Sequence, residues 1–254
     1  GMFERDIAPA IAPAGIIAHR TLRTCGMGES TLGERLHDLM IEQGDTLVNT
    51  TAQAGIISIR LRTRADNEAA AHATLDALAQ TVYDRLGNGV FGEGDDTLPI
   101  AIGRYLRNAG QTLTTAESCT GGLIGKMLTD ASGASDYYAG GIVAYANAVK
   151  RDLLDVPESL LEAHGAVSPQ VASAMALGAQ KRLGSDWAIS VTGIAGPTGG
   201  TEDKPIGLVY FGLAGPEGVT VHEENLQSTR DHIRTRAAVV ALNRLRVALM
   251  DAAK

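Results

Sequence analysis

The hydrophobic positions of the first 94 residues recur with two periods, one typical of strands and one typical of helices. Side chains alternate strictly between hydrophobic and polar from Ile57 to Arg62, which predicts a strand over residues 55–64 with one buried face. Residues 15–24 and 46–49 predict two more strands. The polar side of the strand at 55–64 is basic, and we interpret its arginines as a solvated face: Arg60, Arg62 and Arg64.

The helical period of about 3.6 residues governs the remainder of this region. Leucines recur at helical spacing after Ser30, which we expect to cap that helix. Asn67 is expected to cap a long alanine-rich helix that ends near Leu86. The glycine-rich, acidic residues 87–96 are predicted to form a linker. Strands and helices in this irregular order indicate a small α+β domain over residues 1–94.

From residue 97 onward, strand and helix patterns alternate. The predicted strands are 112–116, 140–146, 187–192 and a hairpin formed by 206–214 and 219–226. Helices are predicted to begin near Pro99, Gly122, Asn147, Ser168 and a capping box at Ser228. This alternation, with one hairpin, predicts a three-layer α/β/α domain with a mixed sheet over residues 95–254.

Composition narrows the class of protein. The 254 residues are 44% hydrophobic and contain no hydrophobic run near the roughly 20 residues that a membrane span needs. A net charge of −7 disfavours a general nucleic-acid binder. Cys25 and Cys119 are too few for a disulfide framework or a zinc site. We expect a cytoplasmic protein without a signal peptide, and we interpret Gly1 before Met2 as a remnant of tag removal.

The turn that follows the predicted strand 112–116 is the first candidate for chemistry. It gathers Glu117, Ser118, Cys119 and Thr120 at the carboxyl end of a strand, where open α/β sheets bind ligands. Helix-start N–H groups there would bind an anion or stabilise an oxyanion. The alternative is that Ser118 and Thr120 only cap the helix. Cys119 is a competing nucleophile, which we expect to be a buried thiol instead.

A serine nucleophile needs a base. None of the six histidines lies in a reactive setting, so lysine is the next candidate. With Asn147 as N-cap, Lys150 lies in the first helical turn, where the helix dipole favours a neutral amine. Its alternative is an exposed lysine, and Lys126 is a rival base that we expect to be solvated. Tyr145 is either a proton relay or an ordinary strand aromatic.

A second glycine-rich loop follows the predicted strand 187–192. Gly193, Gly196 and Pro197 permit close backbone approach to a ligand, and the amides of residues 192–200 are suited to an anion. The alternative is a tight crossover without a ligand. Two such loops at the carboxyl ends of two strands favour one shared ligand crevice.

At these motifs the sequence resembles the CinA family. The matching segments are 115–122 (TAESCTGG), 140–150 (GGIVAYANAVK), 164–168 (HGAVS), 191–200 (VTGIAGPTGG) and 204–210 (KPIGLVY). They cover the region 97–254, which resembles the family's C-terminal nicotinamide-nucleotide amidase domain. Residues 15–94 resemble its KH-type middle domain. The family's N-terminal pyrophosphatase domain has no counterpart in this sequence, so we expect either a piece of a longer protein or a short gene product.

The resemblance implies hydrolysis of nicotinamide mononucleotide to nicotinate mononucleotide and ammonia in pyridine-nucleotide salvage, without metal or cofactor. The catalytic residues that it implies are Ser118, Tyr145 and Lys150. The substrate-binding residues that it implies are Thr120, Gly121, Gly122, Ser135, Thr192, Gly193, Gly196 and Arg230. The family commonly has Gly-Asp-Arg where this chain has Ser228-Thr229-Arg230. We expect Lys150 to deprotonate Ser118 and the amides of residues 120–122 to hold the oxyanion.

Two other interpretations remain. A non-catalytic nucleotide-binding or regulatory module would use the same loops to hold a phosphate. RNA binding by the first domain is disfavoured by its net charge and by the position of the Gly-Xaa-Xaa-Gly segment Gly89–Gly92 inside the predicted linker. We expect the first domain to serve packing, dimer formation or connection to a further domain, and we expect a homodimer that does not bind membranes.

Overall fold

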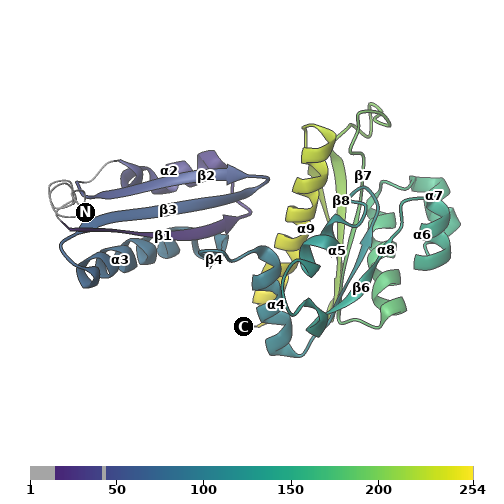
Figure 1. The fold of residues 1–254 in the computed structure, drawn as a ribbon. Coiled ribbons are helices and arrows are strands. Elements are labelled where there is room, and N and C mark those ends of the chain that lie inside the picture. Colours follow the sequence, from purple (N-terminus) through teal and green to yellow (C-terminus); the bar gives the residue numbers. More distant parts are fainter. Residues whose placement is uncertain (1–14, 42–43, 254) are drawn as a thin grey trace, which may run out of the picture. The chain divides into compact units, whose positions relative to one another are not determined.

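The computed structural model describes residues 15–41 and 44–253, and its contacts divide the chain into two compact units. Unit 1 is Gly1–Asp96 and unit 2 is Thr97–Lys254. Each unit has its own sheet (Figure 1). The expected fold class, a small α+β KH-like domain followed by an α/β domain with a mixed sheet, is confirmed.

Unit 1 contains an antiparallel sheet in the order β2-β3-β1-β4. Its strands are β1 (Ile16–Cys25), β2 (Thr46–Gln53), β3 (Ile56–Ala65) and β4 (Val90–Glu93). Its helices are α2 (Glu29–Met40), α3 (Glu68–Leu86) and the short 3₁₀ helix η2 (Gly87–Gly89). Both α2 and α3 pack on one face of this sheet.

The core of unit 1 follows from the alternation in β3. Ile57, Ile59 and Leu61 are buried and meet Leu22 of β1 together with leucines of both helices. The opposite face is not covered by either helix, and it carries Ser58, Arg60 and Arg62, which alternate with the core positions.

Local predictions in unit 1 have mixed outcomes. The side chain of Asn67 accepts a hydrogen bond from Ala70 N, so its role as N-cap is confirmed. The prediction for Ser30 is wrong, because the N-cap of α2 is Gly28 and it makes no side-chain cap bond. Residues 87–96 are not only a linker: they include η2 and β4, and β4 pairs with β1.

Unit 2 contains a five-stranded mixed sheet in the order β6-β5-β7-β8-β9. The strands are β5 (Leu113–Glu117), β6 (Tyr138–Val143), β7 (Trp187–Gly193), β8 (Leu208–Gly215) and β9 (Gly218–Asn225). Strand β5 runs parallel to both β6 and β7, whereas β7, β8 and β9 are antiparallel in succession. All five residues of β5 are buried, as expected for a central strand covered on both faces.

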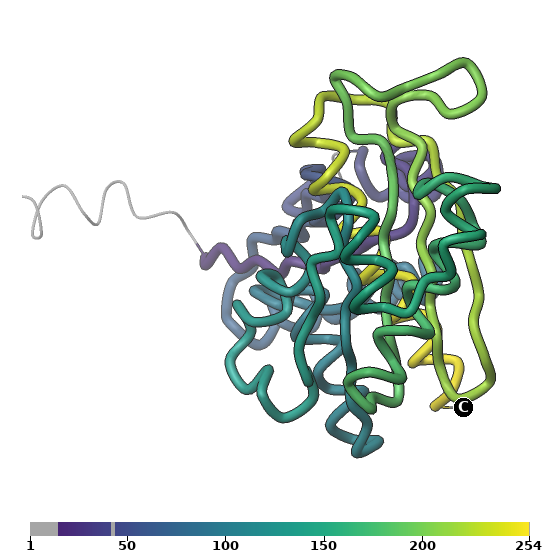
Figure 2. The backbone as a smooth tube through the Cα atoms, turned by 90° about the vertical axis from the view of Figure 1, so that its right-hand side faces the viewer, coloured from purple at the N-terminus to yellow at the C-terminus, as the bar shows by residue number. Residues whose placement is uncertain are grey.

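Helices cover both faces of this sheet, which gives the three layers (Figure 1). One side holds α4 (Leu98–Ala109), α5 (Leu123–Thr129) and α9 (Arg230–Ala252). The other side holds α6 (Asn147–Leu154), α7 (Glu158–His164) and α8 (Pro169–Leu183). The short 3₁₀ helix η3 (Ala134–Asp136) precedes β6. Residues 194–207, between β7 and β8, form a loop that projects past the end of the sheet (Figure 2, green).

The helix starts in unit 2 test four predictions. Ser168 accepts a hydrogen bond from Val171 N, and Thr97 caps the helix in which Pro99 lies at the start. Asn147 is not the N-cap of α6, because Ala146 occupies that position without a side-chain bond. The capping box at Ser228 is also absent, since Thr229 precedes α9 and its side chain makes no cap bond.

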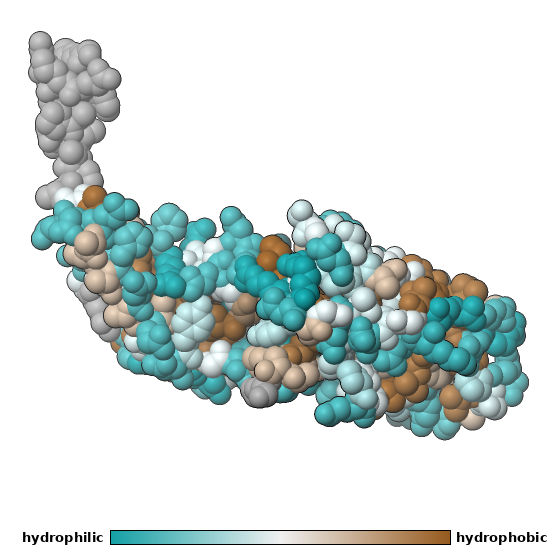
Figure 3. All heavy atoms as spheres, turned by 90° about the horizontal axis from the view of Figure 1, so that it is seen from below, coloured by the Kyte–Doolittle hydropathy of each residue, from teal (hydrophilic) through white to brown (hydrophobic). Residues whose placement is uncertain are grey.

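Exposed hydrophobic residues occur on both units, including Ile17 and Ile41 of unit 1. In the view of Figure 3, hydrophobic residues gather most densely on unit 2. Exposed leucines of unit 2 include Leu153, Leu177 and Leu183. Within the described ranges, no helix has both the length and the hydrophobicity that crossing a membrane requires.

Candidate active site

Ser118 stands directly after β5, at the carboxyl end of the central strands. Its N–H donates to Val191 O at 2.9 Å, which continues the pairing of β5 with β7 beyond the last strand residue. The side chain lines a cavity of about 190 Å³ and the residue is 8% exposed. The serine is therefore nearly buried, with an opening to one small cavity.

Lys150 is the partner of Ser118. Its Nζ lies 3.0 Å from Ser118 Oγ, 2.8 Å from Ala144 O and 3.2 Å from Tyr145 O. A protonated amine has three N–H groups, one for each of these oxygens. A neutral amine has two N–H groups for the two carbonyls, and its lone pair then faces the serine hydroxyl. The two carbonyls thus orient the lone pair toward Ser118.

Burial favours the neutral form of this amine. Lys150 is 1% exposed, and loss of hydration lowers the pKa of its amine from the ordinary value of 10.5. Among the described residues, no carboxylate forms a salt bridge with it. Its place in the first turn of α6 agrees with the expectation, although the cap is Ala146, whose carbonyl accepts from Lys150 N.

The two rivals of Ser118 and Lys150 are poorly placed. Burial raises the pKa of the Cys119 thiol to about 12, so the thiol is neutral near pH 7. Lys126 is exposed and pairs with Asp130 at 2.5 Å on the surface of α5. Both findings agree with the sequence-based expectations, which are a buried thiol for Cys119 and a solvated amine for Lys126.

The prediction that the amides of residues 120–122 hold an oxyanion needs correction for two of them. Gly121 N donates to Ser118 O at 3.1 Å, and Gly122 N donates to the carboxylate of Glu117 at 3.0 Å. The same carboxylate accepts from two N–H groups of α5, those of Ile124 and Gly125. Glu117 therefore caps the helix start, and the amides of both glycines are engaged.

The amides left available lie one and two residues after the serine. Thr120 N–H makes no hydrogen bond within the described part of the chain, and Cys119 N–H makes none with another described residue. The hydroxyl of Thr120 is buried without a partner there. Donors directly after a nucleophile are well placed to stabilise an oxyanion formed on its substrate.

Arg234 of α9 holds this turn from the other side. Its Nε donates to Cys119 O at 3.1 Å, and its Nη2 donates to Thr120 O at 2.9 Å. The Cys119 carbonyl shares a peptide group with Thr120 N–H, so a cation on the carbonyl fixes and polarises that N–H. Glu117 on the amides and Arg234 on the carbonyls fix the backbone of the turn between them.

The second glycine-rich loop forms the opposite wall of the cavity. Thr192 and Gly193 line it together with Ala195, and Thr192 Oγ1 donates to Ala166 O at 2.8 Å. A Cβ at Gly193 would lie 2.8 Å from Leu208 O, so this close approach to β8 requires glycine. Gly196 takes part through its carbonyl, which accepts from Arg230 Nη1 at 2.6 Å.

Arg230 and Tyr145 lie together at the same cavity. Arg230 Nη2 donates to the hydroxyl of Tyr145 at 3.2 Å, and Tyr145 is 61% exposed. The contact of Tyr145 with Lys150 is made by its backbone carbonyl. Its hydroxyl is therefore engaged at the rim with Arg230, and this geometry supports a binding role over a proton relay between Ser118 and Lys150.

Ser135 lies apart from the turn at Ser118 and from the loop after β7. It is exposed in η3, which precedes the first residue of β6. Strands β5 and β6 are parallel, so Ser135 lies toward the end of the sheet opposite Ser118. It does not line the cavity. Four other expected substrate-binding residues belong to the two bordering loops but are not in the lining either: Thr120, Gly121, Gly122 and Gly196.

Sequence reasoning missed Glu117 as a cap and Arg234 altogether. One signal for Arg234 was available: it lies four residues after Arg230, so the two share one face of α9. No group of three or more metal-ligating side chains with the geometry for an ion occurs in the described ranges.

The fold and the site together define a class of protein: a three-layer α/β protein with a buried serine–lysine pair at the carboxyl edge of its central strands. The CinA C-terminal domain matches residues 95–249, and the KH domain of damage-inducible protein CinA matches residues 19–92. The chain therefore belongs to the CinA family.

Relatives and solved structures agree with this assignment. A putative competence-damage inducible protein of Symbiobacterium thermophilum is 46% identical over 96% of this chain and 61% of its own length. A CinA-like protein of Microcystis aeruginosa is 48% identical over 91% of this chain and 56% of its own length. The chain thus spans less than two thirds of these two relatives.

Two crystal structures resemble a smaller part of the chain. The competence/damage inducible protein CihA of Agrobacterium tumefaciens is 42% identical, with a TM-score of 0.58, over 60% of this chain and 93% of its own. A CinA superfamily protein of Klebsiella pneumoniae is 30% identical, with a TM-score of 0.59, over 61% of this chain and 96% of its own.

Proposed function

We propose that unit 2 is a serine amidohydrolase that converts nicotinamide mononucleotide to nicotinate mononucleotide and ammonia. The observation that carries the proposal is the distance of 3.0 Å between Lys150 Nζ and Ser118 Oγ, with two backbone carbonyls holding the amine. Membership of the CinA family supports the choice of substrate, because residues 97–254 resemble the nicotinamide-nucleotide amidase domain of that family.

In the first step, the lone pair of neutral Lys150 takes the proton of the Ser118 hydroxyl. The Oγ atom attacks the carboxamide carbon, and the negative charge develops on the carboxamide oxygen. The N–H groups of Cys119 and Thr120 are the donors that we assign to this oxyanion. Loss of one such donor costs on the order of 3 kcal/mol in the transition state.

Collapse of the tetrahedral intermediate breaks the carbon–nitrogen bond. Protonated Lys150 gives its proton to the leaving nitrogen, so ammonia departs and an ester of Ser118 remains. Neutral Lys150 then deprotonates a water that attacks this ester. The products are the nicotinate carboxylate and the regenerated Ser118 hydroxyl, and no metal or redox group enters the balance.

Charge in the cavity lining supports binding of a phosphate-bearing substrate. Arg230 is the one basic side chain besides Lys150 among the described lining residues. Gly196 O and the Tyr145 hydroxyl hold its guanidinium. A guanidinium held in this way suits the phosphate of a nucleotide whose carboxamide lies at Ser118.

Replacement of Ser118 by alanine tests the proposal. Ammonia release from nicotinamide mononucleotide is expected to vanish, while the far-ultraviolet circular dichroism spectrum and the melting temperature stay near those of the parent chain. Ser132, an exposed serine of unit 2, supplies the matched control through Ser132→Ala. If Ser118→Ala turned over the substrate at a rate comparable to that of the control, the assignment of Ser118 as nucleophile would be refuted. A parent chain that binds the nucleotide without releasing ammonia would indicate a non-catalytic module instead.

A further inference from the structure

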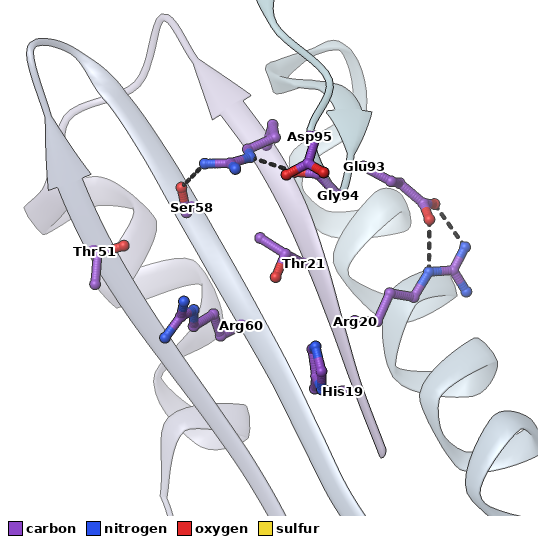
Figure 4. A pocket seen from close by; sticks show the side chains of 10 residues that line it. His19, Arg20, Thr21, Thr51, Ser58, Arg60, Glu93, Gly94 and Asp95 are labelled. Carbon is purple, nitrogen blue, oxygen red and sulfur yellow. Dashed lines mark hydrogen bonds and ion pairs between the residues drawn. The ribbon is translucent and has the colours of Figure 1, made fainter. Parts of the chain in front are cut away.

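The open face of the unit 1 sheet contains a second cavity, of about 660 Å³. Its floor is formed by neighbouring positions of three strands, because Arg23 pairs with Ser58, Ser58 with Thr51, and Thr21 with Arg60. Figure 4 shows these strands with the helices behind them, so the side chains stand on the uncovered face. Arg23, Arg60 and three hydroxyls thus share one concave surface, which Arg20 and His19 also line.

Arg23 is held in a fixed orientation in this cavity. Its Nε donates to Gly94 O at 2.8 Å, and its Nη1 donates to Ser58 Oγ at 2.6 Å (Figure 4). These two bonds leave its Nη2 without a hydrogen bond to any described residue. A guanidinium fixed at two points loses little side-chain freedom when it binds a ligand, which favours binding.

Arg60 has no carboxylate partner in the described ranges, nor does Arg23. This differs from other arginines of the same unit: Arg20 bonds Glu93 and Asp76, and Arg85 bonds Asp38. The sequence of unit 1 is rich in acidic residues, so carboxylates were available to pair with the sheet face. Cations left unpaired around hydroxyl donors form a complementary surface for a phosphate group.

The rim of the cavity adds an acceptor. The carboxylate of Asp95 lies at the edge, near Gly94 (Figure 4), whereas that of Glu93 is engaged by Arg20. A free carboxylate disfavours a bare phosphate nearby, and it binds sugar hydroxyls well. The lining therefore fits a ligand with a phosphate at one end and hydroxyls at the other.

We propose that this cavity binds a small phosphate monoester that carries hydroxyl groups, such as a sugar phosphate. Its phosphate lies between Arg23 and Arg60 and accepts from the hydroxyls of Thr21 and Thr51. Its own hydroxyls donate to Asp95. The cavity shares no lining residue with the cavity beside Ser118, and the inference does not depend on the amidase activity.

Calorimetric titration of the full chain with ribose 5-phosphate at low ionic strength tests this site. We expect saturable binding that Arg60→Gln weakens about tenfold, the scale of a lost charge-assisted hydrogen bond. Arg62→Gln is the matched control, because Arg62 lies on the same face outside the cavity lining and carries the same charge. Its effect is expected to stay below about twofold, since it acts only through the screened field.

A second variant and three outcomes complete the test. Arg23→Lys keeps the charge and loses the two-point anchoring, so it is expected to weaken binding as well. Equal losses in Arg60→Gln and Arg62→Gln would overturn the proposal in favour of a diffuse basic surface. A loss confined to Arg230→Gln would place the ligand beside Ser118. Binding of a short RNA without saturable binding of ribose 5-phosphate would also overturn it.

Discussion

At the scale of single residues, Lys150 determines how the proposed chemistry depends on pH. Only the neutral amine accepts the proton of Ser118, and burial lowers the pKa of this amine from 10.5. We therefore expect kcat/KM to rise with pH through the lowered pKa and to level off above it. The acid limb is expected to lie below the range of an exposed lysine.

A pH profile of kcat/KM checks this expectation, with Lys150→Arg as the decisive variant. Arginine keeps the positive charge and is not deprotonated in proteins, so that variant is expected to be inactive at every pH. Lys181→Arg, on the exposed surface of α8, is the control and should leave the profile unchanged. A profile without an acid limb would contradict the assignment of Lys150 as base.

Arg234 gives the second prediction at this scale. It contacts the carbonyls of Cys119 and Thr120 and is not among the residues that line the cavity beside Ser118, so we assign it a positioning role. Arg234→Lys is expected to lower kcat about tenfold or more, because the Thr120 N–H loses its alignment with the oxyanion, and to change KM little. Steady-state kinetics separate the two constants. Arg236→Lys, two residues further along α9, is the control; equal effects of both variants would contradict the role.

At the scale of secondary-structure elements, the packing of α8 on α6 fixes the position of Lys150. A Cβ added to Gly178 of α8 would lie 1.9 Å from Leu154 O, at the end of α6. Gly178→Ala is expected to lower the free energy of unfolding by about 1–3 kcal/mol through overpacking and to reduce ammonia release, because α6 must shift.

Urea denaturation and activity assays check this prediction together. Gly33→Ala in α2 is the control, since a Cβ added to Gly33 would have no neighbouring atom within 4 Å. Alanine there is expected to be neutral or stabilising by up to about 1 kcal/mol, because it is the better helix former. A Gly178→Ala protein as stable and active as the parent would show that α8 and α6 adapt without strain.

Most elements are predictable from hydrophobic period, and the exceptions have physical causes. Strand β3 and helix α3 have long, regular patterns, whereas β4 has only four residues inside a stretch of turn-forming glycines. The N-caps of α2 and α6 are Gly28 and Ala146, which form no side-chain bond. Because these N-cap residues make no side-chain hydrogen bond, residue type alone does not predict where the two helices begin.

The candidate active site also has residues that the sequence predicts and residues that it does not. Ser118 and Lys150 are predictable as separate candidates from the strand and helix pattern, and the family resemblance implies that they act as a pair. Arg234 is not predictable, because its bond to Cys119 joins residues 115 positions apart, and only the packing of α9 creates it. The role of Glu117 depends on the exact path of the turn, which the motif does not specify.

At the scale of the whole molecule, unit 2 contains every residue of the cavity beside Ser118. The solved relatives from A. tumefaciens and K. pneumoniae match 60% and 61% of this chain with nearly all of their own length. We therefore expect residues 97–254 to fold alone and to release ammonia at a rate near that of the full chain.

Expression of that segment, followed by thermal denaturation and the ammonia assay, checks the prediction. The full chain measured in parallel is the reference. A cooperative transition with activity within about threefold would fit an independent domain. An unfolded segment, or a folded one without activity, would show that unit 1 supports the site.

The carbonyl pair that holds Lys150 has a consequence for covalent labelling. The chain has only five lysines, so few amines compete for an acylating reagent. Burial lowers the pKa of the Lys150 amine at the bottom of the small cavity from 10.5, so at a given pH a larger fraction of this amine keeps a free electron pair. An acylating reagent small enough to enter would therefore react with Lys150 at a lower pH than an ordinary lysine requires, and protection from this reaction would report occupancy of the cavity.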